Sequence, residues 1–242
     1  MDSKKENKPE NPWLNLGFNI ILPSFLLIKG GKLFESLGIT GENVDAQVFV
    51  FALAFPIAYG IWDLASRRKF NIFSVIGVLS VILTGGIGLM KMSREWIIVK
   101  EGLVPLVLGA AVLLTVFTRR PLAKMIMLNE SVVDLPKIEA ALDERGTREK
   151  FDEALKKATW WVAASFLLSS VLNFALAAYI FKSPTGTEAF NEEVGKMTAL
   201  SFPVIVLPTM VVLFFAMYRL FSAMGECTGL SIEDAMLKRD KK

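Results

Sequence analysis

The chain has 242 residues, of which 53% are hydrophobic, and its mean hydropathy of +0.47 is well above that of an ordinary soluble domain. It contains no histidine and a single cysteine, Cys227, which excludes a disulfide framework, a Cys/His zinc site and a serine–histidine hydrolase. The formal net charge is only +3, so no nucleic-acid partner is expected. We therefore expect a polytopic membrane protein that holds no cofactor and no metal.

Six apolar runs are long enough to cross the roughly 30 Å of hydrocarbon in a bilayer. They predict an all-α fold with six transmembrane helices. The predicted helices cover residues 14–36, 46–66, 72–90, 102–118, 159–181 and 199–221. The remaining segments are a polar tail at 1–13, a charged helical connection at 119–158 and a second tail at 222–242.

The basic residues are distributed unevenly between the two faces of this arrangement. Twenty of the 27 Lys and Arg lie before the first span, between the second and third, between the fourth and fifth, or after the sixth, counting Arg219 at the end of the sixth. The positive-inside rule places these segments, and with them both termini, in the cytoplasm. The opposite face then carries residues 35–45, 91–101 and 182–196, which we expect to be loops.

The connection at 119–158 is the largest predicted soluble segment. Pro136 and Gly146 bracket a short predicted helix at 137–145, because proline suits a first helical turn and glycine the position just past the last. Thr147 is the candidate N-cap of a second helix that continues into the fifth span. The apolar stripe of that helix contains Phe151, Leu155 and Ala158. The alternating acids and bases of this connection are typical of a solvated face rather than of an active site.

Two lysines, Lys29 and Lys32, interrupt the outer half of the first span and are separated by two glycines. One interpretation is that both amines extend to the outer headgroups. The other is that Lys29 faces a watery pocket and pairs with a carboxylate, Glu101 first or Glu35 second. An anion-binding site opening outward is then predicted, with Lys29, Lys32, Arg94, Lys100 and Glu101 as its candidate residues.

Other polar residues inside the predicted spans have structural explanations. Asp63 precedes Arg67 by four residues, which favours an ion pair along one helix. Asn19 and Asn173 are expected to form hydrogen bonds between helices. These residues are predicted to stabilise packing rather than to take part in chemistry.

Glycines and prolines predict where the helices pack closely or bend. Gly85 and Gly86, in TGGIGL (84–89), should let a neighbouring helix approach. Pro203 and Pro208 stand in one span and each removes a backbone hydrogen bond, so this helix is expected to be bent or partly unwound. Broken helices line the substrate sites of some transporters, but kinked helices are also common in proteins that transport nothing.

Several segments resemble the bacterial inner-membrane proteins related to intracellular septation protein A. The resemblance covers about the first 125 residues and lies in PWLNLGFNIILPSFLL (12–27), FNIFSVIGVLSVILTGGIGL (70–89), KEGLVPLVLGA (100–110) and TRRPL (118–122). It implies a multi-pass protein of the bacterial inner membrane that supports envelope synthesis and division through contacts with other envelope proteins. It carries over no catalytic residue, and the charged connection and sixth span depart from the shorter members of the family.

Three functional hypotheses follow. The first is a non-enzymatic envelope protein whose partners are membrane lipids and other envelope proteins. The second is a transporter, channel or lipid-handling protein with an outward anion cavity around Lys29 and Glu101. The third, a membrane enzyme, ranks last, because without histidine only Glu101 and Lys29 lie where a buried acid or base could work.

Overall fold

The computed structural model describes residues 14, 16–67, 72–117, 124, 127–128 and 133–236, with the backbone alone at 63–67, 72–78 and 117. The predicted tail at 1–13 and the Asp63 side chain lie outside the described residues. Those that are described fold as helices, as predicted, together with an isolated antiparallel β-bridge between Val133 and Met236. The chain divides into two compact units: unit 1 is Met1–Glu101 with Asn173–Val204, and unit 2 is Gly102–Leu172 with Ile205–Lys242.

Five of the described helices are long and apolar enough to cross a membrane, which indicates a membrane protein. They cover Gly17–Ser36, Val44–Trp62, Arg94–Leu114, Arg148–Ile180 and Glu188–Thr228. The predicted span at 72–90 coincides with a further helix, α4 (Ile72–Leu89), whose described side chains belong to the shorter apolar stretch Leu79–Leu89. The count of six spans and their orientation therefore stay predictions.

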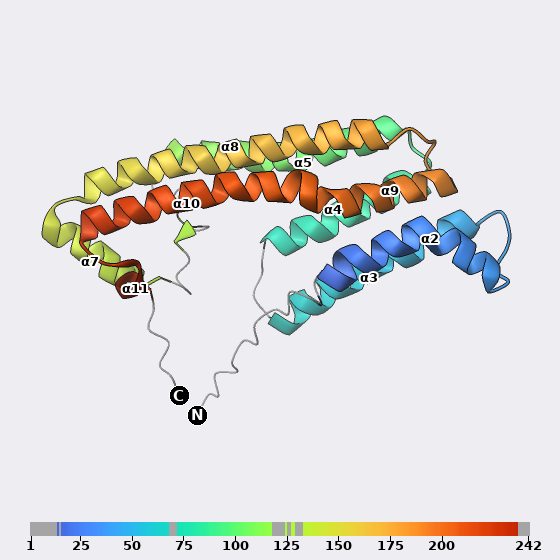
Figure 1. Cartoon of the computed structure of the whole chain (residues 1–242), viewed down its shortest axis with the longest axis horizontal. Coiled ribbons are helices and arrows are strands. Elements are labelled where there is room, and N and C mark those ends of the chain that lie inside the picture. The colour runs from blue at the N-terminus through green and yellow to red at the C-terminus, as the bar shows by residue number, and fades with distance from the viewer. Residues whose placement is uncertain are drawn as a thin grey trace, which may run out of the picture. The chain divides into compact units, whose positions relative to one another are not determined.

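Glycines allow the helices of unit 1 to pack closely. The unit contains η1 (Gly17–Ile21), α2 (Leu22–Ser36), α3 (Val44–Arg67), α4 and α9 (Glu188–Ser201), and Figure 1 shows α2 and α3 side by side. A Cβ on Gly30 of α2 would lie 2.6 Å from the nearer methyl carbon of Val48 on α3. A Cβ on Gly195 of α9 would lie 3.0 Å from the Ser24 carbonyl oxygen. Close helix contact is therefore the structural reason for glycine at these positions.

Two segments predicted as loops are partly helical, 91–101 from Arg94 onward and 182–196 from Glu188 onward, so both predictions are wrong. The helix that begins at Glu188 is α9. The Thr187 hydroxyl caps this helix by accepting a hydrogen bond from the Phe190 amide, 3.2 Å away. Phe190 is fully buried, and its ring centroid lies 5.9 Å from that of Phe49 and 5.8 Å from that of Phe181. Because α9 also contains several charged residues, its sequence did not indicate that Phe190 would be buried.

Unit 2 includes most of α8 (Arg148–Ile180), a helix that is longer than a membrane span requires. The elements of this unit are part of α5 (Arg94–Leu114), η2 (Thr115–Phe117), α7 (Leu135–Arg145), part of α8, α10 (Leu207–Thr228) and α11 (Ile232–Ala235). α8 has 33 residues and is thus about 50 Å long at 1.5 Å per residue. Its charged first three turns extend the apolar part of the helix, and α7 lies beside the end of α10 (Figure 1).

A buried hydrophobic core forms around α7. We call α7, residues 148–158 of α8, residues 220–228 of α10 and α11 the α7 module. Its buried core includes Ile138, Leu142, Phe151, Leu155, Leu220, Met224 and Cys227. The chain after α10 folds back onto the segment before α7: the Asp134 amide donates to the Ala235 carbonyl at 2.9 Å. Residues 229–236, predicted as part of a tail, thus belong to a folded module.

The two prolines of the last long helix do not unwind it. A five-residue π-helical turn, η3 (Phe202–Val206), joins α9 to α10, and the helix continues from Glu188 to Thr228 (Figure 1). Pro203 lies within this turn, and Pro208 lies in the first turn of α10. A π-helical turn also precedes Pro23. This turn is η1, and at its end the Leu22 amide donates to the Gly17 carbonyl. Each π turn stands next to a Leu-Pro pair, where proline cannot donate a regular helical hydrogen bond.

Candidate functional site

A buried lysine and its acceptors form a polar cluster between α4 and α5. Ser80 and Thr84 stand four residues apart on α4 and therefore share one face of that helix. Lys100 and Glu101 follow one another on α5. We call these four residues the Lys100 cluster; all of them belong to unit 1.

Every hydrogen of the Lys100 ammonium has an acceptor in the cluster. The Nζ atom lies 2.7 Å from Glu101 Oε1, 2.8 Å from Thr84 Oγ1 and 3.2 Å from Ser80 Oγ. The Thr84 hydroxyl in turn donates to the Ser80 carbonyl at 3.0 Å. The side chains of Lys100 and Glu101 are 9% and 21% exposed. The ion pair of Lys100 and Glu101 carries no net charge. The hydrogen bonds from Lys100 to Ser80 and Thr84 link α5 to α4.

Such a pair is costly to break. A charge at membrane depth needs a partner, and removing one member of a buried pair typically costs about 3–5 kcal/mol because the other charge stays buried. A pair that is intact can stabilise helix contacts, hold a substrate or move a proton. Saturation of all three lysine hydrogens favours the first of these roles in the structure described here.

The structure brings only two of the five predicted anion-site residues together. Lys100 and Glu101 form the pair just described, whereas Lys29 and Lys32 are exposed on α2. Arg94 donates from Nη1 to the Lys182 carbonyl at 2.8 Å and lies 3.3 Å from its neighbour Glu95, so it joins the chain segment after α8 to the start of α5.

The predicted packing residues have varied surroundings. A Cβ on Gly85 would make an ordinary 3.5 Å contact with Leu53, and one on Gly86 would meet nothing within 4 Å. The close approach in this glycine run is at Gly88, where a Cβ would lie 2.7 Å from the Phe49 ring. Asn19 lies in η1 and Asn173 in α8, and both residues have interaction partners.

A second polar network fixes the segment between α8 and α9. The Glu193 carboxylate is buried and accepts hydrogen bonds from the Ser183 amide at 3.1 Å, the Ser183 hydroxyl at 2.8 Å and the Lys182 amide at 3.2 Å. Asn191, two residues before Glu193 on α9, donates a hydrogen bond to the Asp45 carbonyl at the start of α3, at 2.8 Å. These bonds account for both buried polar side chains of α9.

Sequence reasoning missed Ser80, Thr84 and Glu193. The i,i+4 spacing of Ser80 and Thr84 was a usable signal, because two hydroxyls on one face of an apolar helix favour a polar partner opposite. Glu193 gave no such signal, since its acceptor role depends on where the segment after α8 turns. Among the described residues, no group of three or more His, Cys, Asp or Glu side chains could hold a metal ion.

Searches with this chain found no matching family model, no matching curated protein and no matching solved structure. The function is therefore argued from the molecule itself.

Proposed function

We propose that this chain is a non-enzymatic, six-span protein of a bacterial inner membrane that supports envelope or septation processes through contacts with other envelope proteins or lipids. The observation that carries the proposal is the α7 module, in which two separate parts of the chain share one buried core. A folded, charged module attached to membrane helices is suited to contacts with partners. The resemblance to the septation family of residues 12–122 agrees with this role.

The module also supports the proposed orientation. Lys137 of α7 donates from Nζ to the Asp234 carbonyl in residues 229–236 at 2.7 Å. Thr147, between α7 and α8, donates from Oγ1 to the Cys227 carbonyl in the last turns of α10 at 2.8 Å. Two segments in one core lie on one side of a membrane, so an even number of spans separates them. α8 and the helix that ends in α10 are both long and apolar enough to make those two crossings. The positive-inside rule then assigns the module to the cytoplasm.

The Lys100 cluster favours a second candidate function, transport or handling of an anion. A buried lysine paired with a carboxylate inside an apolar helix is a functional candidate on physical grounds. Transport would require the ammonium to exchange Glu101, Thr84 or Ser80 for a ligand during the cycle. We therefore propose this alternative for Lys100 rather than for Lys29, which is exposed on α2.

Complementation of a deletion strain separates the two functions. Leu142→Asp puts a charge into the core of the α7 module, while Ala140→Asp adds the same residue at an exposed position of the same helix. The proposed function predicts that Leu142→Asp fails to restore normal cell length and septum placement although the protein is present in membranes, and that Ala140→Asp restores both.

The double variant Lys100→Met/Glu101→Leu removes the buried charges together and tests the alternative. We expect it to complement the deletion. Loss of complementation here, with Leu142→Asp active, would favour anion transport over the proposed role. A deletion strain with normal cell length and septa would overturn the septation proposal.

A further inference from the structure

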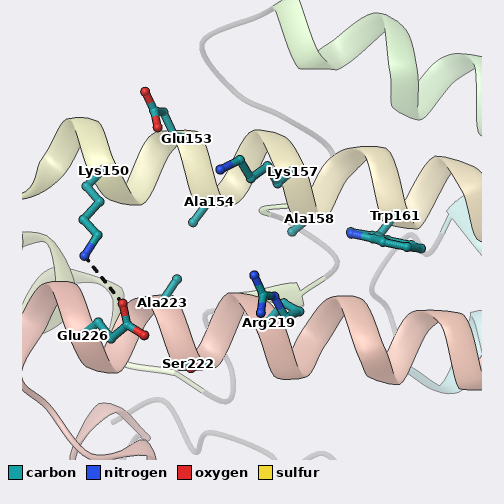
Figure 2. Close-up of a pocket in the computed structure, with 10 residues that line it drawn as sticks. All are labelled: Lys150, Glu153, Ala154, Lys157, Ala158, Trp161, Arg219, Ser222, Ala223 and Glu226. Atoms are coloured by element: carbon teal, nitrogen blue, oxygen red, sulfur yellow. Dashed lines mark ion pairs between the residues drawn. The ribbon is translucent and has the colours of Figure 1, made fainter.

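A groove of about 340 Å³ lies between α8 and α10 in unit 2. α8 lines it with Lys150, Glu153, Lys157 and Trp161, and α10 with Arg219 and Glu226. In Figure 2 the Arg219 guanidinium extends from α10 into the space between the two helices, and the Trp161 indole lies in the same space. Small side chains, Ala154 and Ala223 among them, leave room at its base.

The groove lies where both helices change from apolar to charged. α8 has no charged residue from 158 to its end, and α10 has none from its start to Tyr218. The Trp161 ring packs edge-on against Phe215, with 4.9 Å between the ring centroids. The apolar parts of α8 and α10 therefore end at about the same level. Tryptophan and arginine at such a boundary are typical of the headgroup layer of a bilayer.

The groove has an excess of positive charge. Lys150 pairs with Glu226 at 3.5 Å, which neutralises one end. Glu153 points away from α10 in Figure 2. Within the part of the chain that the structure describes, Lys157 and Arg219 have no ion-pair partner. Two cations therefore remain available to an anion that enters between the helices.

We propose that this groove binds the phosphate of an anionic phospholipid in the leaflet next to the α7 module. The planar guanidinium of Arg219 matches two phosphate oxygens at once, Lys157 adds a second positive charge, and Trp161 packs against the glycerol end of the acyl chains. The proposal rests on the membrane orientation proposed above but not on a role in septation. Lipid binding of this kind would anchor the module to the membrane surface.

The test is native mass spectrometry of the full chain released from nanodiscs that contain equal amounts of phosphatidylglycerol and phosphatidylcholine. We expect phosphatidylglycerol to be retained preferentially. The variant Lys157→Gln/Arg219→Gln should lower this preference about tenfold or more, since it removes both cations that have no ion-pair partner in the groove. The control Lys156→Gln removes an exposed lysine of α8 that does not line the groove, and should leave the preference unchanged.

Further arms identify the source of the phosphate and the place where it binds. Excess inorganic phosphate should not displace the lipid; complete displacement would show a site for free anions and overturn the lipid proposal. Ala223→Trp fills the groove without changing its charge and should also abolish the preference. If it does not, the lipid binds elsewhere.

The outcomes separate this proposal from its premise. Thermal unfolding of each variant shows whether a lost preference is a lost fold, and Arg219→Lys, which keeps the charge, should retain most of the binding. If the chain is recovered outside the nanodisc fraction, the membrane premise fails. If it is in the nanodiscs and shows no preference between the two lipids, the lipid proposal alone fails, whatever the complementation result.

Discussion

The helices of unit 1 and the α7 module are stabilised by different interactions. In unit 1, glycines such as Gly195 let helices approach closely, and buried polar residues such as Lys100 and Glu193 connect neighbouring elements. In the α7 module the contacts are made by large aliphatic and aromatic side chains, among them Leu142 and Phe151. Aromatic packing occurs in unit 1 as well, at Phe49, Phe181 and Phe190, so the two regions differ mainly in close glycine contacts and buried charged side chains.

The difference is the one expected if the helices of unit 1 lie in lipid and the α7 module lies in water, as proposed above. Lipid chains are as apolar as leucine, so burying leucine between membrane helices gains little, and close contact and hydrogen bonds must stabilise the packing. Water penalises exposed apolar surface, so a module outside the bilayer is stabilised by burying it. The variants below test whether these two kinds of contact stabilise the two regions to different extents.

Breaking the Lys100 cluster should have the largest effect on stability. Glu101→Gln leaves the Lys100 ammonium buried without its carboxylate, and we expect a loss of about 3–5 kcal/mol in the free energy of unfolding. Unfolding in detergent followed by circular dichroism measures it. The double variant Lys100→Met/Glu101→Leu, which removes both charges, should recover most of the loss. Equal destabilisation of both variants would mean that the charge pair is not what stabilises this contact.

A core truncation tests the other region. Leu142→Ala removes a side chain that is 2% exposed, and we expect a loss of about 2–4 kcal/mol from the α7 module. Limited proteolysis near residues 133–148 should accelerate while the membrane helices stay protected. Ile232→Ala, at a half-exposed position of the same module, serves as the control and should change stability by less than about 0.5 kcal/mol. Equal proteolysis of the membrane helices would contradict the division into regions.

Two glycine substitutions test close helix contact in unit 1. A Cβ on Gly195 would lie 2.8 Å from Ile28 and 3.0 Å from both Leu27 and the Ser24 carbonyl, so Gly195→Ala should cost about 1–3 kcal/mol. Gly86→Ala meets nothing within 4 Å and should stabilise its helix by up to about 1 kcal/mol. Melting temperatures in detergent should therefore move in opposite directions; a shift of both in one direction would argue against contact as the cause.

The smallest effect is expected from a surface ion pair of the α7 module. Arg148 donates from Nε and Nη2 to the two oxygens of Asp143, at 2.7 and 2.9 Å, and these hydrogen bonds lower the pKa of the Asp143 carboxyl below its ordinary 3.8. The stabilisation is present above pH 4 and is lost as the pH falls through the lowered pKa. Asp143→Asn should reduce the acid dependence of module stability slightly, measured by unfolding between pH 2 and 7. An unchanged pH profile would show that the exposed pair contributes nothing.

Local signals predicted part of this fold correctly. The helix expected at 137–145 is α7, with Gly146 in the left-handed conformation at its end and the Asp134 side chain as its N-cap. Phe151, Leu155 and Ala158 are buried, as their spacing indicated. Such features depend on residues a few positions apart, and the hydrophobic period records them directly.

Contacts between distant segments could not be predicted in the same way. The packing of residues 229–236 against α7 joins positions about a hundred apart, and no periodicity encodes it. Likewise, apolar runs indicate where a lysine interrupts a helix but not whether it faces another helix, so the sequence favoured Lys29 over Lys100 as the partner of Glu101. The prolines of the last long helix indicated an irregularity correctly, while its form, a π turn, depends on how the helix is held on both sides.

The burial of Cys227 gives the molecule an internal reporter. Its thiol is the only one in the chain, is fully buried in the core of the α7 module, and lies beside the Thr147 contact made by its own carbonyl. A thiol reagent can reach it only when this module opens. The rate of labelling of the unmodified protein in intact membranes therefore measures opening of the module separately from unfolding of the membrane helices, without a single engineered residue.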